Sequence, residues 1–175
     1  MAIDRQDSPY RRGNRYDMLP IPMVAENCVK VPAGAVDLIV ESRALNDQVL
    51  AETYADGTLP SAAVHFDDGG ASLHVCGATD GLEYLRFDCF ELEPHYHYID
   101  HEAHGNVIVR IDEIAVGDPI EFSLGCVRNR LPDMLRNAGA PTLADETAAR
   151  LGEVLAGVEA VRTLMEGAGR PVATA

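Results

Sequence analysis

The middle third of the chain alternates hydrophobic and polar residues with a period of two, which is typical of half-buried β-strands. Turn signals such as Asp67-Asp68-Gly69-Gly70 and Asp80-Gly81 separate the alternating runs. Strands joined by short turns pair with their neighbours in an antiparallel meander. The pattern therefore predicts a meander of about five strands within residues 61–113, with strands at 61–66, 71–77, 82–90, 95–99 and 107–111.

The flanking regions instead repeat apolar residues at every third or fourth position, which predicts helices at 43–54, 119–136 and 143–166. Asp118 and Thr142 are suited to cap the second and third of these helices, and Pro132 is expected to break the second or to restart it. The third helix is expected to bury one apolar stripe, made of Ala144, Ala148, Leu151, Leu155, Val158, Val161 and Met165.

Two short extended runs are expected near 23–31 and 36–40, and residues 1–20 have the composition of an irregular arm. Strands followed by helices predict an α+β fold, in which C-terminal helices pack on one face of the sheet. We therefore expect an N-terminal arm at 1–20 and one α+β domain at 21–175.

Composition and charge narrow the classes of function. The chain has 175 residues, of which 47% are hydrophobic and 24% charged, enough for one domain with a real core. Its net charge of -14 disfavours nucleic acid and anionic lipid as partners, and no apolar run approaches the roughly 20 residues of a membrane span. Residues 1–30 carry a net +1 and the remainder -15. A basic arm on an acidic body predicts a homo-oligomer or a larger complex formed through the arm, with a solvated tail as the alternative.

The four cysteines, Cys28, Cys76, Cys89 and Cys126, are widely spaced and include no C-x-x-C pair. A chain of this size with a full core does not need disulfides, and the N-terminus lacks the apolar core of a signal peptide. We therefore expect reduced thiols in a cytoplasmic protein. Cys76 and Cys89 fall in predicted strands and are expected to be small core residues.

Four of the six histidines cluster within residues 91–105. Imidazole and carboxylate groups are ligands for zinc, iron and manganese. His95 and His97 are two positions apart on a predicted strand, so both rings lie on one face. His101 and His104 are placed on the following loop, where they can serve as further ligands or be solvated. His65 and His74, on neighbouring predicted strands, are weaker candidates.

Hairpin geometry adds an acid and a base to this face. If residues 91–94 form the loop, Phe90 pairs with His95 and Asp88 with His97. Asp88 and Arg86 then share the face of the two histidines, while Tyr96 and Tyr98 pack on the opposite side. The same count adds apolar residues to the histidine face, namely Leu73, Val75, Val109 and Ile111.

The spacing of His95 and His97, followed by Glu102, resembles the first metal motif of the cupin family. The resemblance covers about eight residues. The second cupin motif, which supplies a later histidine, has no counterpart because no histidine follows His104. The cupin fold and activity are therefore not carried over.

These patterns favour a small cytoplasmic metal-dependent enzyme that acts on a small molecule. The presence of Arg86 on the histidine face favours an anionic molecule. In this hypothesis His95 and His97, helped by an acidic group or by His101 or His104, hold a divalent ion (Zn, Fe or Mn). Asp88 or Glu93 acts as acid or base, and Arg86 orients the substrate. Two alternatives stay open: a non-catalytic subunit or assembly protein with structural histidines, and a metal-free lyase or isomerase that uses a His–Asp pair.

Overall fold

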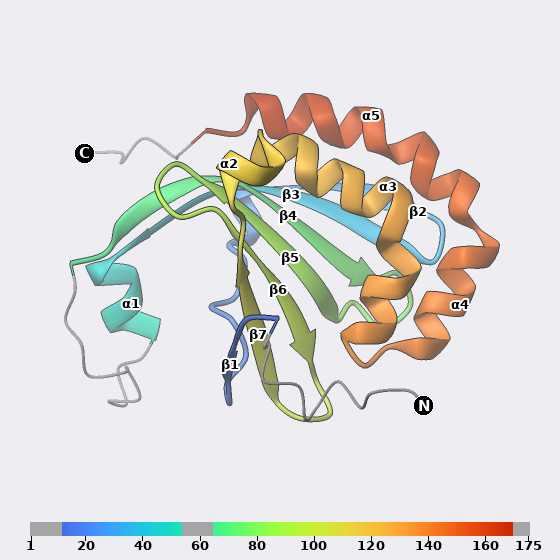
Figure 1. The fold of residues 1–175 in the computed structure, drawn as a ribbon, viewed down its shortest axis with the longest axis horizontal. Helices are drawn as coiled ribbons and strands as arrows, with labels where there is room; N and C mark the ends of the chain where they lie inside the picture. The colour runs from blue at the N-terminus through green and yellow to red at the C-terminus, as the bar shows by residue number, and fades with distance from the viewer. Residues whose placement is uncertain (1–11, 54–64, 170–175) are drawn as a thin grey trace.

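The computed structural model describes residues 12–53 and 65–169 (Figure 1). Seven strands form one antiparallel sheet in the order β1-β7-β6-β5-β4-β3-β2. From β2 to β7 each strand pairs with the next in sequence, and β1 adds to the far edge beside β7. The strands are β1 (Asn14–Tyr16), β2 (Cys28–Ala33), β3 (Val36–Asn46), β4 (Asp67–Gly77), β5 (Glu83–Phe90), β6 (His95–Asp100) and β7 (Gly105–Arg110).

Helices cover one face of this sheet, which confirms the predicted α+β class (Figure 1). The described helices are a 3-10 turn (Ala25–Asn27), α1 (Asp47–Thr53), α2 (Glu113–Val116), α3 (Pro119–Asn137), α4 (Pro141–Ala149) and α5 (Leu151–Gly167). The sheet is larger than the predicted meander because β3 is eleven residues long and joins β2 to β4. Residues 14–16, within the predicted arm, form β1.

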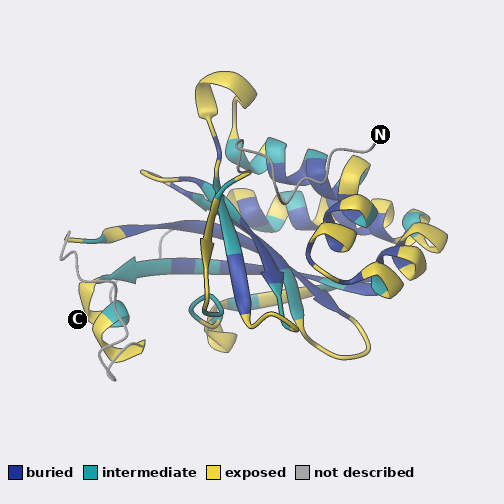
Figure 2. Cartoon of the chain, turned by 60° about the horizontal axis from the view of Figure 1, so that its bottom comes forward, coloured by how far each residue is buried: buried dark blue, intermediate teal, exposed yellow. Residues whose placement is uncertain are grey.

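The hydrophobic core lies between the sheet and the helices α3 and α5. It contains fully buried residues from the inner strands, such as Leu38, Leu73, Val75 and Phe87. Figure 2 shows the buried residues concentrated in the central strands and on the inward sides of the helices. Burial of this apolar surface supplies most of the driving force for the fold.

The first predicted helix and the first predicted hairpin differ from the structure. Residues 43–46 belong to β3, and α1 begins after Asn46, whose side-chain oxygen accepts a hydrogen bond from the Val49 amide at 3.0 Å. An asparagine in this position caps a helix, so the helix starts later than the apolar spacing indicates. Asp67–Gly70 lies inside β4 rather than in a turn, and most of the predicted strand at 61–66 falls outside the described residues.

The C-terminal helices follow the prediction with three corrections. Asp118 caps α3 by accepting a hydrogen bond from the Glu121 amide. Pro132 does not break α3, because buried residues anchor the helix on both sides of the proline. The predicted helix at 143–166 is split at Arg150 into α4 and α5, and Thr142 lies inside α4 instead of capping it.

The break at Arg150 changes the phase of the apolar stripe. Leu155 is therefore 43% exposed, and Val154 is buried in its place. Among the described residues, no helix has both the length and the apolar character required to cross a membrane.

The two faces of the sheet have opposite chemistry, and this corrects the expected apolar surroundings of the histidines. Leu73 and Val75 lie in the core beneath the helices, Val109 packs against that core, and Ile111 lies beyond the end of β7. The other face carries polar and charged side chains. They come from five strands: Glu41, Arg43, Ser72, His74, Arg86, Asp88, His95, His97 and Asn106.

A β-bulge explains the error on β4. The register shifts between Val75, which pairs with Leu85, and Cys76, which pairs with Glu83, so Tyr84 is an extra residue in β5. An extra residue reverses the side on which later residues point relative to a regular ladder. Counting residue pairs from the turn between β4 and β5 without this bulge therefore assigns Leu73 to the wrong face.

Candidate metal centre

Asp88, His95 and His97 meet on the polar face of the sheet. Asp88 on β5 pairs directly with His95 on β6, and Arg86 pairs with His97. The register is two residues away from the predicted one, and a shift of two keeps every side chain on its face. Each of the three residues offers one ligand atom, and these atoms lie within 4.8 Å of one another. The predicted convergence of the two histidines with a carboxylate is therefore present.

The distances suit a shared ion. The Nε2 atom of His95 lies 3.3 Å from Oδ2 of Asp88, and the Nε2 atom of His97 lies 3.2 Å from the same oxygen. Two atoms that each lie about 2.1 Å from a tetrahedral zinc ion are separated by about 3.4 Å. Asp88 and His97 are almost fully buried, and the side chain of His95 is 18% exposed.

Hydrogen bonds on the far side of each imidazole fix its tautomer. The Nδ1 atom of His95 lies 2.7 Å from the carbonyl oxygen of Glu93, which can only accept, so Nδ1 is the donor. A neutral His95 therefore presents the lone pair of Nε2 to Asp88. Backbone carbonyls commonly orient metal-binding histidines in this way.

The same reasoning applies to His97. Its Nδ1 atom lies 3.0 Å from Oδ1 of Asn106. The Asn106 amide is oriented by Met18, whose carbonyl accepts a 2.7 Å hydrogen bond from Nδ2. Oδ1 of Asn106 must then accept from His97, and the Nε2 lone pair of a neutral His97 also points to Asp88. With both imidazoles neutral, two lone pairs and a carboxylate oxygen converge on one position, an arrangement that a metal ion or a proton on one imidazole would stabilise.

Asp88 is held as a carboxylate. Its Oδ1 accepts a hydrogen bond from the Ser72 hydroxyl, leaving Oδ2 to face the imidazoles. Burial by itself raises the pKa of Asp88, but hydrogen bonds from His95 and His97 and the charge of Arg86 hold that pKa well below its usual range. Burial lowers the pKa of His97, whereas the hydrogen bond to Asp88 outweighs burial and raises the pKa of His95.

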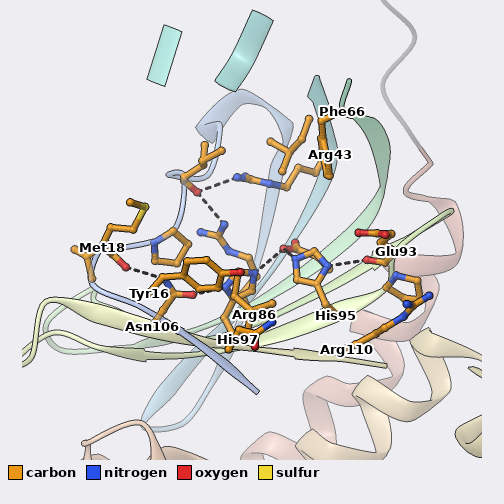
Figure 3. Close-up of a pocket in the computed structure, with 18 of the residues that line it drawn as sticks. Tyr16, Met18, Arg43, Phe66, Arg86, Glu93, His95, His97, Asn106 and Arg110 are labelled. Atoms are coloured by element: carbon orange, nitrogen blue, oxygen red, sulfur yellow. Dashed lines mark hydrogen bonds and ion pairs between the residues drawn. The ribbon is translucent and has the colours of Figure 1, made fainter. Parts of the chain in front are cut away.

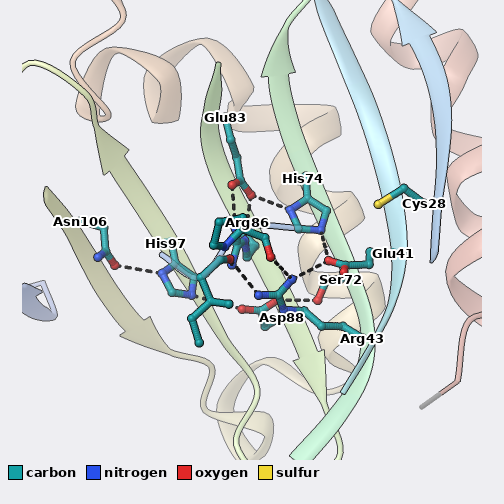
Figure 4. A network of polar contacts seen from close by, with 12 residues as sticks. Cys28, Glu41, Arg43, Ser72, His74, Glu83, Arg86, Asp88, His97 and Asn106 are labelled. Atoms are coloured by element: carbon teal, nitrogen blue, oxygen red, sulfur yellow. Dashed lines mark hydrogen bonds and ion pairs between the residues drawn. The ribbon is translucent and has the colours of Figure 1, made fainter. Parts of the chain in front are cut away.

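A buried charge network lies beside the triad (Figure 4). Both imidazole nitrogens of His74 contact carboxylates, with Nδ1 2.5 Å from Glu83 and Nε2 3.0 Å from Glu41. Arg86 makes a two-bond contact with Glu83 at 2.8 and 2.7 Å, and Glu41 pairs with Arg43 at 2.7 Å. The charges are therefore compensated in pairs, as buried charges must be. His74 has no free nitrogen for a metal ion.

The N-terminal segment packs against this network and accepts hydrogen bonds from its arginines. The carbonyl oxygen of Ile21 accepts hydrogen bonds from Nη2 of Arg43 and Nη1 of Arg86, both at 2.8 Å. The Pro22 carbonyl accepts a further bond from Arg43. The segment that precedes β2 is thus fixed by the two arginines, in addition to the bond between Met18 and Asn106.

Asp68 fixes the turn that leads into β6. Its carboxylate accepts hydrogen bonds from the backbone amides of Leu92 and Glu93 at 3.1 and 2.9 Å. This turn also supplies the Glu93 carbonyl that orients His95. Asp68 therefore supports the candidate metal centre through this turn. The sequence pattern assigned Asp68 to a turn, and it gave no indication of this role.

A cavity of about 540 Å³ opens above the triad (Figure 3). Asp88, His95 and His97 line it, together with Arg43, Arg86, Arg110 and Glu93. The remaining lining is mainly apolar, and much of it comes from the N-terminal segment. The apolar lining residues are Met18, Leu19, Pro20, Ile21, Leu45, Leu50, Phe66, Pro94 and Ile108. Its volume falls in the range of small-molecule sites.

The other predicted site residues lie outside the triad of Asp88, His95 and His97. Arg86 lines the cavity, and each of its three guanidinium nitrogens donates a hydrogen bond to Glu83 or Ile21. Its role in orienting a substrate stays a prediction. Glu93 also lines the cavity. The triad does not include His101 or His104, which lie in the turn between β6 and β7.

The turn histidines and the remaining aromatic residues are explained by local contacts. The Nε2 atom of His101 lies 2.8 Å from the Glu83 carbonyl oxygen, and the exposed His104 has a positive φ of 48°. His65 is exposed and pairs with Asp47. Tyr96 and Tyr98 pack on the helix side, as predicted; the Tyr96 ring stacks on Phe87 at 5.7 Å.

All four cysteines are unpaired. Burial raises the pKa values of Cys76 and Cys89 to about 12. Thiols with such values are protonated at neutral pH and are poor nucleophiles. The interpretation of these two cysteines as small core residues is consistent with their positions.

The chain belongs to the family described as a domain of unknown function (DUF7700), whose match spans residues 30–162. The matched region includes the triad and the buried charge network beside it, and it leaves out the N-terminal wall of the cavity. Comparisons with curated proteins and with solved structures give no match.

Proposed function

We propose that this protein is a metal-dependent enzyme in which Asp88, His95 and His97 hold one divalent ion at the floor of the cavity. The observation that carries the proposal is the convergence of two imidazole lone pairs and one carboxylate oxygen, with every opposite atom engaged in a hydrogen bond. Ligands oriented in this manner are typical of metal sites.

Three protein ligands leave coordination positions for water or substrate, which is characteristic of catalytic sites rather than closed structural ones. Two histidines and one carboxylate form the ligand set of many iron oxygenases, and zinc and manganese also accept these ligands. A bound ion would act as a Lewis acid or lower the pKa of a bound water. The cavity above the triad gives a small substrate access to those positions.

Within this proposal Asp88 is a metal ligand, so a different group must move protons. Glu93 suits that role because it lines the cavity and its carbonyl contacts the His95 ring. Glu93 is an exposed residue of the turn between β5 and β6, which allows exchange of protons with water.

The distances also suit a second candidate, a metal-free acid–base site. A proton on Nε2 of His95 would give a charge-assisted hydrogen bond to Asp88 at 3.3 Å. In that case the cation between the ligands is the imidazolium itself. The two candidates differ in whether a metal ion copurifies and binds.

The deciding experiment is metal analysis of the full chain purified without a histidine tag, followed by titration of the chelator-treated protein with Zn²⁺, Mn²⁺ and, under anaerobic conditions, Fe²⁺. We expect one equivalent of ion per chain in the wild type. We expect less than a tenth of an equivalent in Asp88→Asn, which keeps the shape of the side chain but removes its charge.

The matched control is His104→Asn, because His104 lies outside the triad and Asn tolerates a positive φ. This variant should bind one equivalent. If the wild type binds no ion at micromolar concentration, or if Asp88→Asn binds as well as the wild type, the metal-dependent proposal is wrong.

A further inference from the structure

The composition of the cavity wall carries information about the substrate. On the basis of the proposed metal centre, we infer that the cavity takes a small monoanionic molecule with an apolar body. Its anionic head group would complete the coordination of the ion, and its body would lie against the apolar wall above the triad.

Charge is the first argument. The protein has a net charge of -14, yet its cavity is lined by three arginines and only two carboxylates, Asp88 and Glu93. Glu41 and Glu83, which neutralise Arg43 and Arg86, are not among the lining residues. Together with these two glutamates, the groups at the cavity carry three positive and four negative charges, a formal charge of -1 that a divalent ion changes to +1. With the ion bound, a site of this sign inside an acidic protein favours an anion.

The triad itself sets the charge of the head group. His95 and His97 are neutral when they coordinate through Nε2, and Asp88 supplies one negative charge. A divalent ion bound to these three ligands keeps one positive charge, which a single anionic group such as a carboxylate neutralises.

The apolar wall is the second argument. One part comes from the N-terminal segment, with Met18, Leu19 and Ile21, and another from the region around α1, with Leu50 and Phe66. Figure 3 shows Met18 and Phe66 on opposite sides of the view, with Arg86 and His97 between them. Such a wall adds little affinity for a small polar anion, but it favours a ligand with methylene or aromatic groups by about 0.8 kcal/mol for each buried CH₂.

The probes are hexanoate, its neutral analogue hexanamide, and acetate, each titrated into the ion-loaded full chain by calorimetry. We expect hexanoate to bind at least tenfold more tightly than acetate, because acetate lacks the body. We also expect it to bind at least tenfold more tightly than hexanamide, which lacks the charge. Equal affinity for hexanoate and acetate, or for hexanoate and hexanamide, would overturn the inference.

Two leucine variants test the location. Leu50→Ala shortens the wall and should weaken hexanoate binding about five- to tenfold, with acetate binding and ion stoichiometry unchanged. Leu155→Ala removes an exposed leucine from α5, on the helix side of the sheet, and should leave all three unchanged. If the two variants changed hexanoate affinity equally, the apolar body of the ligand would not lie against Leu50, and the inferred location would be wrong.

The outcome separates this inference from the proposed function. If the wild type binds no ion, the metal centre is wrong and the ligand class falls with it. If the chain binds one ion but does not distinguish the three probes, the metal centre stands and the inferred substrate class is wrong.

Discussion

Asn106 connects His97 to the N-terminal segment. Its Oδ1 accepts a hydrogen bond from Nδ1 of His97 at 3.0 Å, while its Nδ2 donates to the carbonyl of Met18 at 2.7 Å. A single buried amide therefore orients one histidine of the candidate metal centre and fixes one wall of the cavity.

Replacing Asn106 separates these two roles. Asn106→Ala leaves Nδ1 of His97 without an acceptor, and loss of such a partner costs about 10- to 100-fold in metal affinity. Asn106→Asp keeps an acceptor for His97 but loses the donor to Met18, so it should retain more affinity than Asn106→Ala. Competition titration with a chromophoric chelator measures the affinity. Wild-type affinity in Asn106→Ala would contradict the orienting role.

Neighbouring residues on β4 should behave differently when truncated. Leu73 is fully buried in the helix-side core, so Leu73→Ala should lower the free energy of unfolding by about 2–5 kcal/mol and leave metal stoichiometry unchanged. Ser72→Ala removes the hydroxyl that donates to Asp88 and should weaken metal binding instead. Urea denaturation and metal titration of both variants check this. Loss of metal binding in Leu73→Ala with the fold intact would contradict the assigned faces.

Glu83 should make stability depend on acid pH. Burial raises the pKa of Glu83, but hydrogen bonds from His74 and Arg86 outweigh burial and lower it to about 2, against 4.5 for a free glutamate. The stabilisation is fully present above pH 4.5 and is lost as the pH falls from 4.5 towards 2. Glu83→Gln should therefore be less stable by about 3 kcal/mol at neutral pH, with a smaller deficit in acid.

Denaturation of the two proteins between pH 3 and pH 7 measures the Glu83 effect. The difference in free energy of unfolding should shrink as the pH falls. A difference that stays constant across this range would mean that Glu83 has the same pKa in the folded and unfolded states.

Removal of the ion should lower thermal stability. An ion present at about 100 times its dissociation constant stabilises the folded state by about 2.7 kcal/mol, which corresponds to roughly 5–10 °C in Tm for a domain of this size. Scanning calorimetry with and without EDTA should show this difference in the wild type. Asp88→Asn should melt at the same temperature in both conditions, and an equal EDTA effect in this variant would point to a different site.

The sequence allowed the fold class and the shared face of His95 and His97 to be predicted because both depend on local pattern. Alternation placed His95 and His97 on one face, and that result does not depend on the register of their partner strand. Asp88 shared the face because the predicted register differed from the observed one by two residues, which preserves parity.

Other features depend on contacts that no local pattern indicates. Asn106 and Met18 are 88 positions apart in the chain, and Ile21 and Arg86 are 65 apart. Asp68 was part of an apparent turn signal, yet it is buried and holds a different turn. Such long-range hydrogen bonds become visible only when the strand order and the position of the N-terminal segment are known.

The extra residue Tyr84 in β5 also limits how the hairpin between β4 and β5 can vary. Because of the bulge, Glu83 and Arg86 reach the same side of the sheet although three positions separate them, and there they form their two hydrogen bonds. Deletion of one residue at this point would turn Glu83 towards the hydrophobic core. The buried guanidinium of Arg86 would then lack its carboxylate partner. Changes in residue type at the exposed tip, around Asp80 and Gly81, should therefore be tolerated far better than any change in the length of β5.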